Sequence, residues 1–81
     1  MKVKVLFFAS CQDIVGKREA EVEVPEGATV ADLVAEVAVA HPRFLQIEKS
    51  LMVSVNQGYV ERGEELNQGD EVAFIPPVSG G

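Results

Sequence analysis

The four residues at the end of the sequence, 78–81, are the ones whose types and spacing suggest chemistry. They read Val-Ser-Gly-Gly and follow the step Pro76-Pro77. Proline fixes the backbone φ angle, so this step predicts a stiff, extended exit from the preceding domain. The four residues behind it reach at most about 14 Å. Because Ser79, Gly80 and Gly81 are thin, we expect them to enter a narrow channel of another protein and to present the Gly81 carboxylate there. The simpler alternative is a frayed terminus without a role.

A free carboxylate is a poor acyl donor, because its charge repels nucleophiles and oxide is a bad leaving group. Activation by ATP as an acyl-adenylate would remove both obstacles, and a partner enzyme would have to supply that site. The rest of the sequence offers no alternative centre. Its one cysteine, Cys11, and its one histidine, His41, are not paired by any motif, and neither metal-ligand spacing nor a phosphate-binding glycine loop is present. We therefore expect no bound cofactor, no metal and no independent catalytic site, with Gly81 as the reacting residue.

Length and composition limit the remaining classes. The 81 residues suffice for one domain, and 47% of them are hydrophobic, as in a folded globular protein. The net charge of -6, with scattered basic residues, argues against nucleic-acid binding. A single cysteine excludes an internal disulfide. Neither a secretory signal nor an apolar run of about 20 residues is visible, so we expect a cytoplasmic protein without a membrane segment.

The elements that must position the tail can be predicted from hydrophobic periodicity. Thr29 is typical of a helix N-cap, with Asp32 three positions on, and His41-Pro42 is expected to end the helix. Apolar residues at helical spacing follow Thr29 and predict one buried stripe. Residues 10–17 are expected to form a loop. Alternating patterns predict strands at 2–9, 19–24, 51–56, 59–60 and 71–75.

The order of these elements predicts an α+β fold, with a mixed sheet of four to five strands and one main helix on one face. The first and last strands can lie side by side and parallel in the middle of the sheet, because the helix supplies the crossover. This is the β-grasp, or ubiquitin-like, arrangement. We expect one domain over 1–77 and a flexible tail over 78–81.

The alternation also predicts an apolar patch on the sheet face away from the helix. If Val3, Val5 and Phe7 face the helix, then Leu6 and Phe8 face away from it. By the same reasoning Ala73 and Ile75 join them, and Tyr59 could extend the patch. An exposed apolar cluster of this kind indicates a protein-binding surface. The alternative is that the loop residues Phe44 and Leu45 fold over it.

The sequence resembles a known family, the small, sulfur-carrying subunits of molybdopterin synthase, which are ubiquitin-like β-grasp proteins. The resemblance lies in residues 5–9 (Val-Leu-Phe-Phe-Ala), Gly16, Val55-Asn56-Gln57 and the long final stretch 69–81. It extends over essentially the whole chain. Gln12 stands where bacterial members often have arginine, far from the tail.

The resemblance implies a function. Gly81 would be adenylated by a ubiquitin-activating-type enzyme that uses ATP, and would then become a thiocarboxylate with sulfur from a persulfide donor. The tail would enter the large synthase subunit and donate sulfur to cyclic pyranopterin monophosphate, with Gly80 allowing close approach. Two small and two large subunits would form a heterotetramer. The residues expected to contact the partners are Phe8, Tyr59, Ile75, Pro76, Pro77, Val78 and Ser79.

Two alternatives remain open at this point. One is a related carrier for thiamine thiazole synthesis or tRNA thiolation, or a modifier attached to proteins. The other is a β-grasp interaction domain without catalysis, whose tail would be dispensable.

Overall fold

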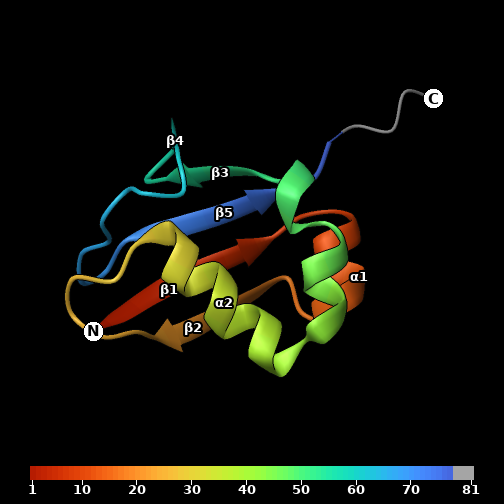
Figure 1. The fold of residues 1–81 in the computed structure, drawn as a ribbon, viewed down its shortest axis with the longest axis horizontal. Coiled ribbons are helices and arrows are strands. Elements are labelled where there is room, and N and C mark those ends of the chain that lie inside the picture. The colour runs from red at the N-terminus through yellow and green to blue at the C-terminus, as the bar shows by residue number, and fades with distance from the viewer. Residues whose placement is uncertain (78–81) are drawn as a thin grey trace.

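A five-stranded mixed sheet with one main helix across one face forms the domain (Figure 1). The structure is a computed structural model that describes residues 1–77. The strand order in the sheet is β2-β1-β5-β3-β4. The elements are β1 (Lys2–Phe7), α1 (Ser10–Val15), β2 (Glu19–Glu23), α2 (Val30–Ala40), the 3-10 helices η1 (Pro42–Gln46) and η2 (Glu48–Ser50), β3 (Met52–Val55), β4 (Gly58–Val60) and β5 (Glu71–Ile75).

The centre of the sheet is the parallel pair of β1 and β5, as predicted. β1 also pairs with β2 in antiparallel fashion, and β5 pairs with β3. Val5 on β1 lies opposite Val72 on β5, and both side chains are fully buried under the helix. Phe74 is buried as well, and its ring contacts Phe7 and Phe44 at centroid distances of 6.1 Å and 5.3 Å. Burial of each such side chain contributes about 2 kcal/mol, so the central pair anchors the core.

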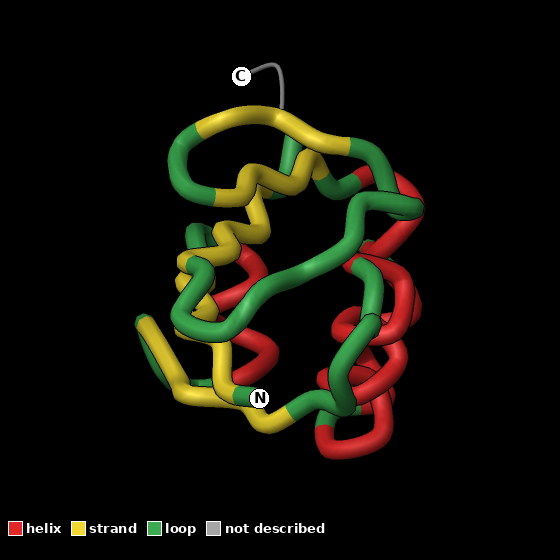
Figure 2. The backbone as a smooth tube through the Cα atoms, turned by 90° about the vertical axis from the view of Figure 1, so that its left-hand side faces the viewer, coloured by secondary structure: helices red, strands yellow, loops and turns green. Residues whose placement is uncertain are grey.

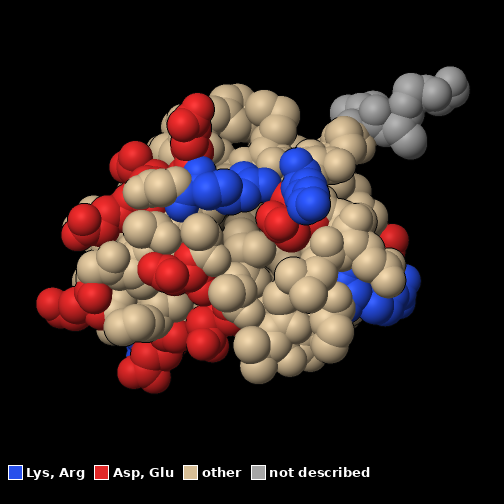
Figure 3. Space-filling model, in the orientation of Figure 1, with Lys and Arg blue, Asp and Glu red and all other residues tan. Residues whose placement is uncertain are grey.

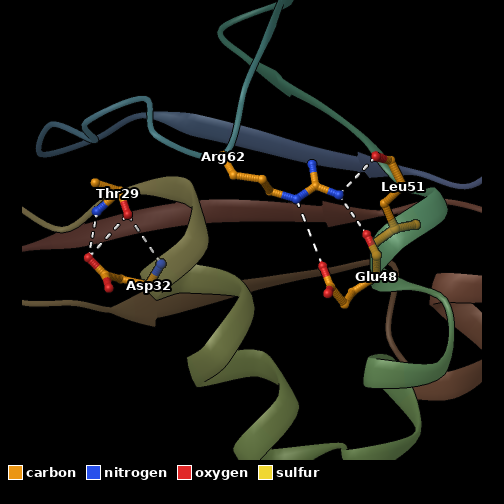
Figure 4. Close-up of polar contacts among 5 residues, drawn as sticks. All are labelled: Thr29, Asp32, Glu48, Leu51 and Arg62. Carbon is orange, nitrogen blue, oxygen red and sulfur yellow. Dashed lines mark hydrogen bonds and ion pairs between the residues drawn. The ribbon is translucent and has the colours of Figure 1, made fainter.

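The predicted helix begins and ends where the sequence indicated. The Thr29 backbone N–H donates to the Asp32 carboxylate at 2.9 Å, and the Asp32 N–H donates to the Thr29 hydroxyl at 3.3 Å (Figure 4). This reciprocal cap contributes about 1 kcal/mol. α2 ends at Ala40, before Pro42. Its buried stripe consists of Val30, Leu33, Val34, Val37 and Ala38. Figure 2 shows the sheet and this helix as two layers.

The prediction of a loop over residues 10–17 was wrong, because six of these residues form α1. Cys11 and Val15, one helical turn apart, are both buried, and their burial stabilises a helix too short to be stable alone. Gly16 ends it with a φ of 81° and donates its N–H to the Gln12 carbonyl at 2.7 Å. Glycine adopts this left-handed conformation without strain.

The segment between α2 and β3 lies on the helix side of the sheet. Phe44 in η1 is fully buried against Phe74, in an edge-to-face contact of the core. Leu45 is 60% exposed and lies beside Ala31 and Val34 of α2. The alternative in which Phe44 and Leu45 cover the opposite face is therefore wrong. None of the helices in the described part of the chain has the length and apolar character that a membrane crossing needs.

Candidate functional site

The root of the predicted tail lies at the carboxyl end of the central strand β5. Ile75 is the last residue of β5 and is half-buried. Pro76 is half-buried and Pro77 is exposed, so the chain leaves the domain over these two residues. Four predicted site residues lie outside the described residues: Val78, Ser79, Gly80 and Gly81.

A row of side chains crosses the sheet face that lacks the helix. Leu6 on β1 is the register partner of Ala73 on β5, and Ala73 is the partner of Ser54 on β3. Ser54 in turn lies opposite Tyr59 on β4, which is 68% exposed. Side chains of directly paired residues lie on the same face, so this row places Tyr59 on the predicted patch.

Two further side chains extend the row toward the root of the tail. Phe8 follows β1, is 46% exposed, and donates its backbone N–H to the Phe74 carbonyl at 3.3 Å. Met52, the first residue of β3, lies opposite Ile75 and is 50% exposed. The structure thus brings together Phe8, Tyr59 and Ile75, as predicted. We call the set Leu6, Phe8, Met52, Tyr59, Ala73 and Ile75 the apolar face.

Met52 is not among the predicted contact residues, although strand alternation indicates its position. Leu51 and Val53 alternate with Met52 in the predicted strand 51–56, and both are buried. Strand alternation then puts Met52 on the other face. An antiparallel pairing of β3 with β5 would have placed it next to Ile75.

The other half of the open sheet face is charged rather than apolar. The Lys4 ammonium lies 3.4 Å from the Glu19 carboxylate and 4.0 Å from that of Glu71. Lys2 lies 3.9 Å from Glu21. These exposed pairs contribute less than about 1 kcal/mol each. Because charged side chains occupy this half of the face, its exposed apolar side chains lie in the other half, nearest the root of the tail.

Arg62 fixes the segment that leads into Met52. Its Nη2 donates to the backbone carbonyls of Glu48 at 2.6 Å and of Leu51 at 3.0 Å (Figure 4). Its Nε lies 3.9 Å from the Glu48 carboxylate. One guanidinium therefore ties the segment after β4 to the first residue of η2 and to the residue that follows η2. No sequence pattern indicates this role of Arg62, because contacts to distant carbonyls have no local signal.

The turn that carries Tyr59 is fixed by a second polar cluster. Asn56 and Gln57 have φ angles of 50° and 74°, which bring the chain back on itself before Tyr59. The Asn56 side-chain amide donates to the Asp70 carboxylate at 3.0 Å and accepts the Glu71 N–H at 3.0 Å. The β3–β4 turn is thereby tied to the start of β5.

The described residues contain few groups suited to covalent catalysis. Cys11 is buried, and burial raises the pKa of its thiol to about 11, so that it is not a thiolate near neutral pH. Within residues 1–77, no group of three His, Cys, Asp or Glu residues could hold a metal ion. The distinctive surface of these residues is instead the apolar face.

Acidic side chains are unevenly distributed on the helix side. Figure 3 shows Asp and Glu gathered over the end of the molecule opposite the carboxyl end of β5. The surface near the tail root is mostly uncharged in this view. On the helix side, the negative charge is therefore concentrated away from the root of the tail.

Comparisons with known proteins extend over the whole chain. The ThiS family model matches residues 5–81. The molybdopterin synthase sulfur carrier subunit of Chlamydomonas reinhardtii is 42% identical over 83 residues, which cover 100% of both chains. The solved structure of SAMP1 from Haloferax volcanii is 31% identical and covers 100% of both chains with a TM-score of 0.87. A candidate molybdopterin converting factor, subunit 1, from Pyrococcus furiosus is 39% identical and covers 95% of this chain and 98% of that one, with a TM-score of 0.86. These structures confirm the ubiquitin-like β-grasp fold.

Proposed function

This chain belongs to the ThiS family, and on that premise we propose that it is the sulfur carrier subunit of a molybdopterin synthase. The relatives named as such match it over their full length, which favours this member of the family over the other carriers. The chain acts together with a partner protein, as the word subunit implies for those relatives.

The chemistry assigned to this chain is acyl transfer at Gly81. Its carboxylate attacks the α-phosphate of ATP in an adenylating partner, which forms an acyl-adenylate and releases pyrophosphate. The terminal sulfur of a persulfide donor then attacks the acyl carbon and displaces AMP, which gives an acyl disulfide. A thiol attacks the donor's sulfur in that disulfide, forms a new disulfide with the donor, and releases the thiocarboxylate. In the large synthase subunit this sulfur passes to cyclic pyranopterin monophosphate. ATP is a substrate of the adenylating partner, and this chain needs no cofactor of its own.

The observation that carries the proposal is the position of Ile75. It ends the central strand, lies on the apolar face, and directly precedes Pro76-Pro77. A partner that covers the apolar face therefore meets the tail at the edge of the same surface. Burial of apolar side chains would supply the affinity, while the thin residues 78–81 would reach the partner's reaction centre.

The same face would serve two partners in turn, the adenylating enzyme and the large subunit. Sequential use requires that neither complex be permanent. A contact area limited to a few strands is consistent with this, because small interfaces are typical of transient complexes. We further propose an assembly of two small and two large subunits, in the cytoplasm.

A second function is favoured by one specific comparison. SAMP1 of Haloferax volcanii, an archaeal modifier protein, is similar over the full chain. A modifier and a sulfur carrier share the adenylation of the last glycine and differ only in the acceptor, an amine or sulfur. The thiazole and tRNA carriers differ from the proposed function in the same way, by the partner that takes the acyl group or the sulfur.

The experiment that tests the proposal is an intact-mass measurement. The protein is incubated with ATP, the adenylating enzyme and a sulfur source, and a variant lacking Gly81 serves as the control. We expect a mass shift equal to the replacement of one oxygen by sulfur, only in the full chain. Addition of the large subunit and the pterin should then reverse the shift and yield the dithiolene product.

Three outcomes would contradict this assignment. No mass shift with an adenylating enzyme that charges another carrier would favour the interaction domain. A shift that the large subunit and pterin do not reverse would favour another carrier. Attachment of the chain to lysines of other proteins, in place of sulfur transfer, would favour the modifier.

A further inference from the structure

An open hollow of about 510 Å³ borders the apolar face on the β1–β2 side. Leu6 and Phe8 form its apolar part, and both belong to the apolar face. Gln12 from α1 and Arg18, which precedes β2, add polar groups. The remaining lining residues are Phe7 and Glu19.

The backbone fixes Arg18 beside the end of β1. Its carbonyl accepts the Phe7 N–H at 2.8 Å, so Arg18 lies next to the strand end from which Phe8 projects. The Arg18 side chain is exposed. Among residues 1–77, the ion pairs are formed by Lys2, Lys4 and Arg62, and none includes Arg18.

Glu19, the acidic residue next to Arg18, already forms an ion pair with Lys4. The Glu19 carboxylate lies 3.4 Å from the Lys4 ammonium, on the side of the charged half of the sheet face. Arg18 therefore lies at the rim of the apolar face, and Glu19 does not neutralise its charge. An arginine in this position is suited to a carboxylate, because its planar guanidinium can donate two parallel hydrogen bonds.

We propose that Arg18, with Gln12 and the apolar floor of Leu6 and Phe8, forms a subsite for one carboxylate side chain of the large synthase subunit. The floor receives the methylene groups of that side chain, and the guanidinium binds its carboxylate, with the Gln12 amide as a second donor. This inference rests on the proposed function, since it assumes that the apolar face docks the large subunit. Arg18 is a specificity residue here and takes no part in the sulfur chemistry.

The neighbouring residue provides a matched control. Lys17 is also exposed, but it lines a hollow on the helix side of the sheet, together with Val15 and Val37. Lys17→Glu and Arg18→Glu change the net charge by the same amount at adjacent positions. A difference between the two variants therefore reports the local site and not the overall charge.

The test is the affinity of the full chain for the purified large subunit, measured by calorimetry at low and at high salt. We expect Arg18→Glu to raise the Kd about tenfold at low salt, with a smaller effect at high salt. Arg18→Gln should have an intermediate effect, because it removes the charge without creating repulsion. Lys17→Glu should change the Kd less than about twofold. Thermal unfolding of each variant checks that the domain is intact.

Equal Kd values for Arg18→Glu and Lys17→Glu would overturn the proposal, since Arg18 would then be an ordinary solvated charge. A loss of affinity only toward the adenylating enzyme would also overturn it, because it would assign the subsite to the other partner. Failure of the proposed function would give a different result: the wild-type protein would show no mass shift after incubation with ATP, the adenylating enzyme and the sulfur source.

Discussion

Met52 lies directly opposite Ile75 in the antiparallel ladder of β3 and β5. The pair links β3, which lies next to the edge strand β4, to β5, which leads into the tail. Both side chains lie on the sheet face without the helix, and Met52 is half exposed. The surface around the root of the tail is therefore wider than the two central strands alone would make it.

Met52→Ala should weaken the binding of the large subunit, because it removes exposed apolar surface next to the tail root. We expect a Kd about tenfold higher, within the range for an interface residue of this kind. Val39→Ala is the matched control, since Val39 is 79% exposed but lies on α2. Calorimetric titration of both variants checks the prediction, and equal losses would show that the apolar face is not the docking surface.

Arg62→Ala should destabilise the domain by about 2 kcal/mol, because it leaves the carbonyls of Glu48 and Leu51 without their charged donor. Arg62→Lys should recover only part of this loss, since an ammonium lacks the planar fork of the guanidinium. Urea unfolding measures both. Arg43→Ala, a change at an exposed arginine in η1, should alter the free energy of unfolding by less than about 0.5 kcal/mol. A similar effect of the two alanine variants would contradict the role given to Arg62.

Glycine at two adjacent positions of the β3–β4 turn should have opposite effects. Gln57 has a φ of 74° and none of the side-chain hydrogen bonds within residues 1–77 involves it, so Gln57→Gly should stabilise the domain by about 0.5 kcal/mol. Asn56→Gly relieves a similar backbone strain but removes the contacts to Asp70 and Glu71. We expect a net loss of about 1 kcal/mol. Thermal denaturation of the two variants is the check, and changes of the same sign would show that the turn backbone alone decides stability.

The burial of Cys11 predicts a specific dependence of stability on pH. Burial raises the pKa of its thiol from 9.0 to about 11, so the folded state holds this proton more tightly than the unfolded chain. The corresponding stability is complete below pH 9 and is lost as the pH rises through 11. The difference in unfolding free energy between the wild type and Cys11→Ala should fall by about 2 kcal/mol between pH 8 and pH 11. A constant difference would show that the thiol titrates normally in the folded state.

The parts of the fold that could be predicted are those with a strong local period. The stripe that begins at Val30 and the alternation around Val72 each allow one secondary structure, and the crossover rule then sets β1 beside β5. α1 was missed because six residues with two buried positions carry too little periodic signal. The stability of α1 comes from burial of Cys11 and Val15 in the core. The local sequence does not indicate which distant residues they contact there.

The candidate site divides in the same way. Strand parity placed Phe8 and Ile75 on the apolar face correctly, because alternation is a local property. The sheet face against which Phe44 packs was not predictable, since an apolar residue in a loop can pack on either face. Its position follows from the contact with Phe74, 30 residues away in sequence. The role of Arg62 likewise depends on backbone carbonyls 11 and 14 residues away.

The central position of β5 has a consequence for protein synthesis. A ribosome makes β1 early and β5 last among the strands, so β1 and β3 cannot acquire their shared neighbour until residues 71–75 have left the exit tunnel. Until then the nascent chain has two half-sheets with unpaired edges and no completed interior. A polypeptide that terminates early lacks the strand that joins them. The apolar face, which includes Ala73 and Ile75 of β5, is therefore complete only on chains translated at least as far as the root of the tail.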